Sequence, residues 1–154
     1  MNDKLICGGV VPPPIIYAVC FFAGLGVDAI WPLPLLNQTF QYAIGVPLII
    51  AGVVLFIAAL REFSRAKTAV THHRPTTGIV ASGPFAISRN PIYLSMTIVF
   101  LGAAIAVDSL MVALHVAPAI AAINTLVIPK EEAFLEKSFG DAYQQYKSAV
   151  RRWI

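Results

Sequence analysis

Two short polar segments hold most of the groups with which this largely apolar chain could bind a charged small molecule. Their candidate binding groups are one guanidinium, one amide, one proline, two carboxylates and three phenols: Arg89, Asn90, Pro91, Tyr93, Glu131, Glu132, Tyr143 and Tyr146. A guanidinium pairs with a carboxylate, a carboxylate pairs with an ammonium group, and an aromatic face attracts a cation. A ligand that carries both charges beside an aromatic ring would find complementary groups here.

The remainder of the chain is too apolar to be surrounded by water. Of the 154 residues, 58% are hydrophobic and only 12% are charged, and the mean hydropathy is +0.75. A soluble domain of this length needs polar residues on all sides, whereas these charges are confined to short segments between long apolar runs. We therefore expect one integral membrane domain over residues 1–154, an all-α helical bundle.

Four apolar runs approach the length that a helix needs to cross a hydrocarbon core of about 30 Å. The predicted spans are residues 10–31, 42–60, 92–107 and 109–128. Pro47 and Pro118 each remove a helix hydrogen bond, so we expect kinks in the second and fourth spans. His115 and Asn124, the polar residues of the fourth span, should face the bundle interior.

The basic residues predict the orientation of the bundle, because Lys and Arg accumulate on the cytoplasmic side of membranes. With a cytoplasmic N-terminus, the two outer connections are residues 32–41 and the turn at Asp108, and neither contains Lys or Arg. All 11 basic residues then share one side with both polar segments. We expect a protein of the inner cell membrane with both termini and the loop 61–91 in the cytoplasm, and its net charge of +3 suits anionic lipid headgroups better than nucleic acid.

A helix is predicted over the tail, residues 129–154. Pro129 suits the first turn of a helix, and the two carboxylates that follow complement the helix dipole. Allowing for a break at Gly140 and Asp141, apolar residues recur at spacings of three and four: Phe134, Leu135, Phe139, Tyr143, Tyr146 and Val150. This amphipathic helix should lie on the membrane or cover the cytoplasmic end of the bundle.

Taken in order, these segments resemble the isoprenylcysteine carboxyl methyltransferase family. The matching text is Arg74-Pro75-Thr76-Thr77, Ser82-Gly83-Pro84-Phe85, Ser88-Arg89-Asn90-Pro91-Ile92-Tyr93-Leu94 and, in the tail, Glu131-Glu132, Phe139-Gly140, Tyr143, Tyr146 and Val150. The resemblance extends from about residue 63 to the end, and the phospholipid methyltransferases are similar over the same stretch.

The resemblance implies a cytoplasmic pocket for S-adenosylmethionine and a lipophilic acceptor, either a small molecule or a prenylated or lipid substrate, with no metal. The implied pocket residues are Arg89, Pro91, Tyr93, Glu131 and Glu132, and Arg89 and Asn90 occupy the positions of the implied catalytic groups. Either glutamate would take the cofactor ammonium, and Arg89 and Tyr93 its carboxylate. Tyr143 or Tyr146 would meet the sulfonium or the adenine.

Two positions depart from the family pattern. Asn90 stands where most relatives have His, and an amide does not titrate near neutral pH. A base would then have to be His72 or His73, or none is needed. A carboxylate acceptor, as in a prenylated cysteine, is already ionised, with a reference pKa of about 3.5, whereas an amine must lose a proton, so a carboxylate or thiolate acceptor is favoured over a phospholipid amine.

The second departure is Ala149, where many relatives carry Arg. Arg151 or Arg152 could replace that residue, but a side chain two places along a helix points elsewhere. Two other functions compete with a methyltransferase: a steroid-reductase-like enzyme that uses NADPH, and a non-enzymatic membrane scaffold. A ligand that binds only the native state raises the melting temperature, so the stabilising cofactor would separate the three.

Overall fold

The structure, a computed structural model, describes residues 11–36, 38–65 and 78–154, and every regular element in these ranges is helical. The elements are α1 (Pro13–Asp28), α2 (Gln38–Arg65), the 3-10 turn η1 (Gly83–Ala86), α3 (Pro91–Ala106), α4 (Leu110–Leu114), α5 (Val116–Ala122), the π-helical segment η2 (Ile123–Val127), α6 (Ile128–Phe139) and α7 (Asp141–Ala149). The predicted all-α class is confirmed for this part of the chain.

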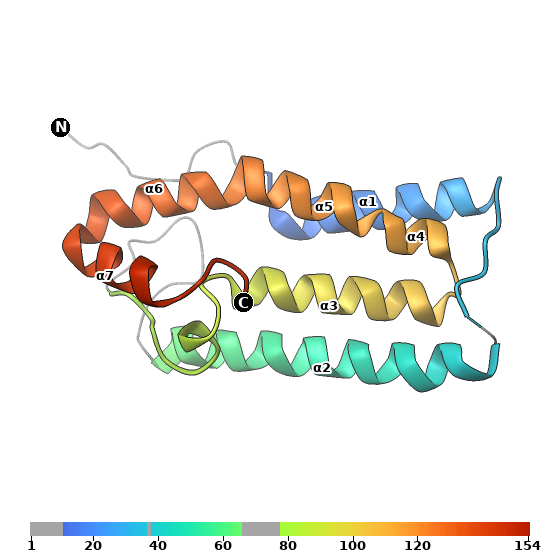
Figure 1. The fold of residues 1–154 in the computed structure, drawn as a ribbon, viewed down its shortest axis with the longest axis horizontal. Coiled ribbons are helices and arrows are strands. Elements are labelled where there is room, and N and C mark those ends of the chain that lie inside the picture. The colour runs from blue at the N-terminus through green and yellow to red at the C-terminus, as the bar shows by residue number, and fades with distance from the viewer. Residues whose placement is uncertain (1–10, 37, 66–77) are drawn as a thin grey trace.

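The long helices lie side by side along one axis, with α3 in the centre (Figure 1). One flank of α3 packs along α2, and α1 packs against α4 and α5 on the other flank. Thr39–Arg65 and Leu110–Phe139 are long and apolar enough to cross a membrane. The apolar helices α1 and α3 have 16 residues each, or ~24 Å, which is shorter than a typical hydrocarbon core.

Glycines allow α2 and α3 to approach closely. A Cβ atom on Gly102 would lie 2.8 Å from the Ile49 nitrogen, and one on Gly45 would lie 2.7 Å from the Gly102 oxygen. A Cβ on Gly52 would lie 2.6 Å from Val99 Cγ2. Small residues at such contacts are typical of membrane helices, whose association depends on close van der Waals packing.

Apolar side chains also cover the outer surfaces of α1 and α2. Phe22 is 69% exposed, Val54 60% and Ile50 57%. Such a large apolar surface would be an aggregation hazard in water, whereas lipid removes the penalty for exposing it. The helix surfaces therefore support the membrane environment predicted from composition.

The fourth predicted span and the tail helix form one helical rod from Leu110 to Phe139. Within it, α6 begins at Ile128, one residue before the predicted helix start at Pro129. Pro129 follows the π-helical segment η2, and such a local change in hydrogen bonding accommodates a proline without ending the rod. The expected interruption near Pro118 falls at His115, between α4 and α5, whereas α2 continues through Pro47.

His115 and Asn124 in this rod face protein, as predicted. His115 lies against α1, where its ring would be 3.3 Å from a Cβ added to Gly24, and its Nδ1 is 2.7 Å from the Met111 oxygen. The Asn124 Oδ1 accepts a hydrogen bond of 3.0 Å from the Trp153 indole.

The break expected at Gly140 and Asp141 in the tail is confirmed, whereas the prediction of a helix as far as residue 154 is wrong. Gly140 has a φ of 50°, a conformation that favours glycine, and it separates α6 from α7. Helix α7 ends at Ala149, because Val150 has extended backbone with φ −124° and ψ 132°. The last residues therefore form a non-helical tail that returns to the start of α3 (Figure 1).

Candidate functional site

The start of α3 meets the first turn of α6 at one end of the bundle. Pro91 is the first residue of α3 and is fully buried, so it fixes where the helix begins. Tyr93, two residues later, is buried and donates a hydrogen bond of 2.6 Å from its hydroxyl to Glu131 Oε1. The structure thus brings together the two polar segments, which lie 38 residues apart in sequence.

The neighbouring carboxylate, Glu132, lies between two guanidinium groups. Arg89 Nη1 is 3.2 Å from Oε1, and Arg152 holds the carboxylate in a bidentate manner, with Nε 3.1 Å from Oε1 and Nη2 2.7 Å from Oε2. These hydrogen bonds to Glu132 raise the pKa of Arg152, which therefore stays charged. Two guanidinium groups thus share this one carboxylate.

Arg89 is the most buried member of this cluster. Its side chain is only 10% exposed, against 13% for Glu132 and 39% for Arg152. Arg89 Nη1 also lies 3.5 Å from the Tyr143 hydroxyl, at the limit of a hydrogen bond. Its Nε is buried and has no hydrogen-bond partner among the described residues. An unsatisfied buried donor costs about 1–3 kcal/mol, so an incoming acceptor at this position would stabilise the cluster.

The C-terminal tail is fastened to the segment before α3. The backbone N–H of Arg89 donates to the Arg151 oxygen at 2.9 Å, and the Asn90 side-chain amide donates to the Arg152 oxygen at 2.9 Å. Ser88 Oγ donates to the same Arg152 oxygen at 3.3 Å. The Asn90 amide therefore holds the tail, and the catalytic role expected at this position stays a prediction.

The two tail tyrosines pack α7 onto the site. Tyr143 is 2% exposed, and the Tyr146 hydroxyl donates a hydrogen bond of 2.8 Å to the Phe85 oxygen in η1. Burial raises the pKa of Tyr143 and raises that of Tyr146 to about 12, so both phenols are neutral at physiological pH. Their expected contact with the cofactor stays a prediction, because the observed contacts of both hydroxyls are within the protein.

Sequence reasoning missed Arg152 as a member of this cluster. It placed Arg152 on a continuous helix, where the side chain would point away, whereas the extended backbone after α7 directs it to Glu132. Nothing in the sequence marks the helix end at Ala149 strongly enough to have predicted this. His72 and His73, the candidate bases, lie outside the described residues.

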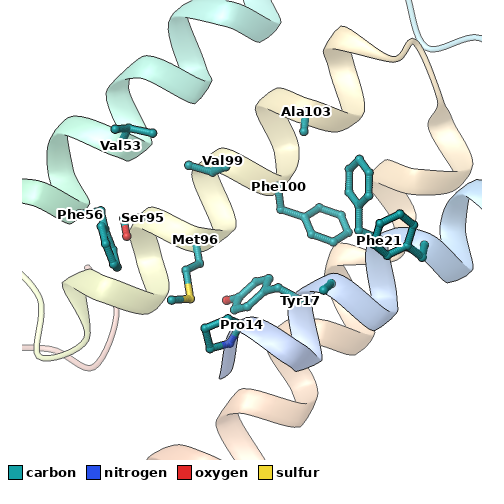
Figure 2. A pocket seen from close by; sticks show the side chains of 12 residues that line it. Pro14, Tyr17, Phe21, Val53, Phe56, Ser95, Met96, Val99, Phe100 and Ala103 are labelled. Atoms are coloured by element: carbon teal, nitrogen blue, oxygen red, sulfur yellow. The ribbon is translucent and has the colours of Figure 1, made fainter. Parts of the chain in front are cut away.

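An apolar groove of about 600 Å³ lies between α1 and α2 and is also lined by α3. Figure 2 shows side chains of all three helices along its walls, among them Pro14, Tyr17, Phe56, Met96 and Phe100. The hydroxyl of Tyr17 is 2.8 Å from Thr97 Oγ1 and donates to the Tyr93 oxygen at 3.2 Å. One end of the groove is therefore adjacent to Tyr93, whose own hydroxyl reaches Glu131.

Residues 40–142 match the family model described as phospholipid methyltransferase. The chain belongs to this family. Membership indicates a membrane methyltransferase, and the matched range contains Arg89, Tyr93, Glu131 and Glu132 but neither α1 nor the C-terminal tail. The more specific resemblance to the isoprenylcysteine enzymes concerns the acceptor, which family membership leaves open.

A relative in Haemophilus influenzae, described as an uncharacterized protein, is 39% identical over 62 residues. The alignment covers 40% of this chain and 98% of the relative. No solved structure matches the chain.

Proposed function

We propose that the protein is an S-adenosylmethionine-dependent methyltransferase that modifies a lipophilic acceptor in the membrane. The observation that carries this proposal is the proximity of the Tyr93–Glu131 pair, the Glu132 cluster and the end of an apolar groove. Charged groups of both signs suit a zwitterionic cofactor, and the apolar groove suits a lipophilic acceptor. The two reactants must meet where these sites adjoin.

The residues present fit the cofactor. We assign the cofactor ammonium to Glu131, because its carboxylate is bonded to Tyr93, the residue whose backbone oxygen adjoins the end of the groove. The buried Nε of Arg89 offers a donor for the cofactor carboxylate. Tyr146, which is only partly buried on α7, supplies an aromatic face for the adenine.

The cofactor supplies an activated methyl group, and the protein must bind and align both reactants and exclude water. We propose a carboxylate acceptor of the prenylcysteine type, because such a group needs no base and Asn90 cannot act as one. A phospholipid amine is the alternative, and it would require a base. The groove then holds the apolar chain of the acceptor with its reactive end toward Tyr93.

We also propose four membrane spans, with this site and both termini on the cytoplasmic side of the inner membrane. Every Lys and Arg of the described residues lies on α2 after Leu60, at the start of α3, or on α6, α7 and the tail. These elements share one end of the bundle (Figure 1). The positive-inside rule then orients the bundle.

Calorimetric titration of the purified protein with S-adenosylhomocysteine tests the cofactor assignment. The wild type should bind, and Glu131→Gln should weaken binding about tenfold or more, because a charge-assisted hydrogen bond contributes about 1.5–3 kcal/mol. Asp141→Asn is the matched control, since Asp141 occupies the first turn of α7 as Glu131 does in α6. A folded wild type that ignores S-adenosylhomocysteine but is stabilised against heat by NADPH would favour a reductase instead.

The groove makes a separate prediction. Ala18 lines it from α1, so Ala18→Trp should fill part of the volume and raise the KM for a prenylated acceptor about tenfold, with unchanged affinity for S-adenosylhomocysteine. Ala23→Trp, also on an exposed position of α1 but away from the groove, should leave both constants as in the wild type. Equal effects of the two tryptophans on KM would argue against acceptor binding in the groove.

A further inference from the structure

We propose that the C-terminal tail, residues 150–154, completes the cofactor site: Arg152 binds the cofactor carboxylate together with Arg89, and Trp153 positions Arg152. This inference rests on the proposed function and assigns residues beyond the range that matches the family model. It also gives a role to the one member of the charged cluster that the sequence did not reveal.

The hydrogen-bond donors of the cluster favour a further acceptor. Among the described residues, the Arg89 and Arg152 guanidinium groups share the single carboxylate of Glu132. The Arg89 side chain is nine-tenths buried, and its Nε has no acceptor among the described residues. A planar carboxylate placed beside the two guanidiniums would accept hydrogen bonds from this Nε and from the second Arg, a geometry for which guanidinium is better suited than ammonium.

The tail is held in a way that couples Arg152 to Arg89. The backbone N–H of Arg89 is bonded to the Arg151 oxygen, and the next residue, Asn90, is bonded to the Arg152 oxygen. The backbones that carry the two guanidiniums are thus fixed to each other, and both side chains meet on Glu132. A shift of the tail would move Arg152 relative to Arg89, so the two guanidinium groups could no longer bind one ligand together.

Trp153 provides the second attachment of the tail. Its indole N–H donates to Asn124 in the π-helical segment η2, and its ring packs against the buried core around α5 and α6. Along the chain, the Arg151 oxygen is bonded to Arg89 just before Arg152, and Trp153 is bonded to Asn124 just after it. The backbone of Arg152 is therefore fixed by contacts of the residues before and after it in the chain.

In the competing explanation, Arg152 has only a structural role and neutralises Glu132. Two ligands distinguish this role from cofactor binding. S-adenosylhomocysteine carries the amino-acid carboxylate, whereas 5′-methylthioadenosine lacks the whole amino-acid part. We expect Arg152→Gln to weaken S-adenosylhomocysteine about tenfold and to leave 5′-methylthioadenosine unchanged in calorimetric titration of the full chain. Arg152→Lys, which keeps the charge but loses the planar fork, should recover part of the loss.

Trp153→Phe tests the positioning role, because it keeps an aromatic ring in the core but removes the N–H that bonds Asn124. It should weaken S-adenosylhomocysteine several-fold and again spare 5′-methylthioadenosine. Arg151→Gln is the matched control, since its exposed side chain lies beside Arg152 and its backbone oxygen is retained. It should bind both ligands as the wild type does.

Arg152→Gln that binds S-adenosylhomocysteine within twofold of the wild type would overturn the inference, while the proposed function would stand. Equal losses for both ligands would also overturn it, because they would indicate a general disturbance of the fold. A folded wild type that binds neither ligand would remove the proposed function itself.

Discussion

Arg89→Ala is expected to reduce the affinity for S-adenosylhomocysteine by about 100-fold while the bundle remains folded. The side chain would supply a buried Nε and part of a guanidinium fork to the cofactor carboxylate, and charge-assisted bonds of this kind contribute about 1.5–3 kcal/mol. Calorimetric titration measures the affinity, and the melting temperature in detergent reports whether the fold survives.

The fold should survive because Glu132 keeps a partner. Removing one member of a buried ion pair normally leaves an uncompensated charge, but Arg152 holds both oxygens of Glu132 after Arg89 is removed. Arg61→Ala removes an exposed guanidinium from the end of α2 and is the control for the loss of charge. An Arg89→Ala protein that binds S-adenosylhomocysteine within a few-fold of the wild type would show that the ligand lies elsewhere.

The affinity of Arg89→Lys for S-adenosylhomocysteine should lie between that of the wild type and that of Arg89→Ala. The ammonium group keeps the charge near Glu132 but cannot reproduce the planar arrangement of Nε and Nη1. Wild-type affinity in Arg89→Lys would mean that only the charge matters, whereas an affinity only partly restored would support a directed contact from Nε.

The two polar segments of the site could be predicted from the sequence, because local residue patterns mark the start of each helix that carries them. Pro91 marks the start of α3 through its fixed φ, and Pro129 with the two glutamates marks the acidic turn of α6, so the chemistry of each segment was readable. That Tyr93 and Glu131 would lie at the same end of the bundle followed from the order of the helices, whereas the hydrogen bond between them was not predicted.

Arg152 could not be predicted because its position depends on tertiary contacts. A helix continuing past Ala149 would have been compatible with the local sequence, and hydrogen bonds from Arg89 and Asn90 instead hold the tail in an extended conformation. The continuity of the rod through Pro129 was missed for a similar reason. A proline usually marks a helix start, and the π-helical segment that absorbs it leaves no pattern in the sequence.

The apolar groove was likewise invisible in the sequence. Hydrophobic residues on membrane helices face lipid and protein alike, so periodicity does not show which of them line a shared volume. The groove exists because α1 and α2 pack on different flanks of α3, and α2 packs especially closely through glycine contacts. These contacts determine the relative positions of the groove wall and the α3 residues that lead to Tyr93.

Gly102→Ala should therefore destabilise the bundle, because it places a methyl group in the close contact between α2 and α3. Its Cβ would lie 2.8 Å from the Ile49 nitrogen and 2.9 Å from the Gly45 oxygen, both backbone atoms that cannot turn aside. Separating two packed helices costs about 1–3 kcal/mol, which exceeds the gain of up to about 1 kcal/mol from the better helix propensity of alanine. We expect the melting temperature in detergent to fall by about 5 °C.

Gly26→Ala should have the opposite effect on the melting temperature. Gly26 lies in α1, and a Cβ there would have no atom within 4 Å, so only the propensity gain remains and the melting temperature should stay constant or rise. Because α2 forms one wall of the groove, Gly102→Ala should also raise the KM for a prenylated acceptor, while Gly26→Ala should not. If Gly102→Ala were as stable as Gly26→Ala, the two helices would not pack as closely as the structure shows, and the shape of the groove would have to be reconsidered.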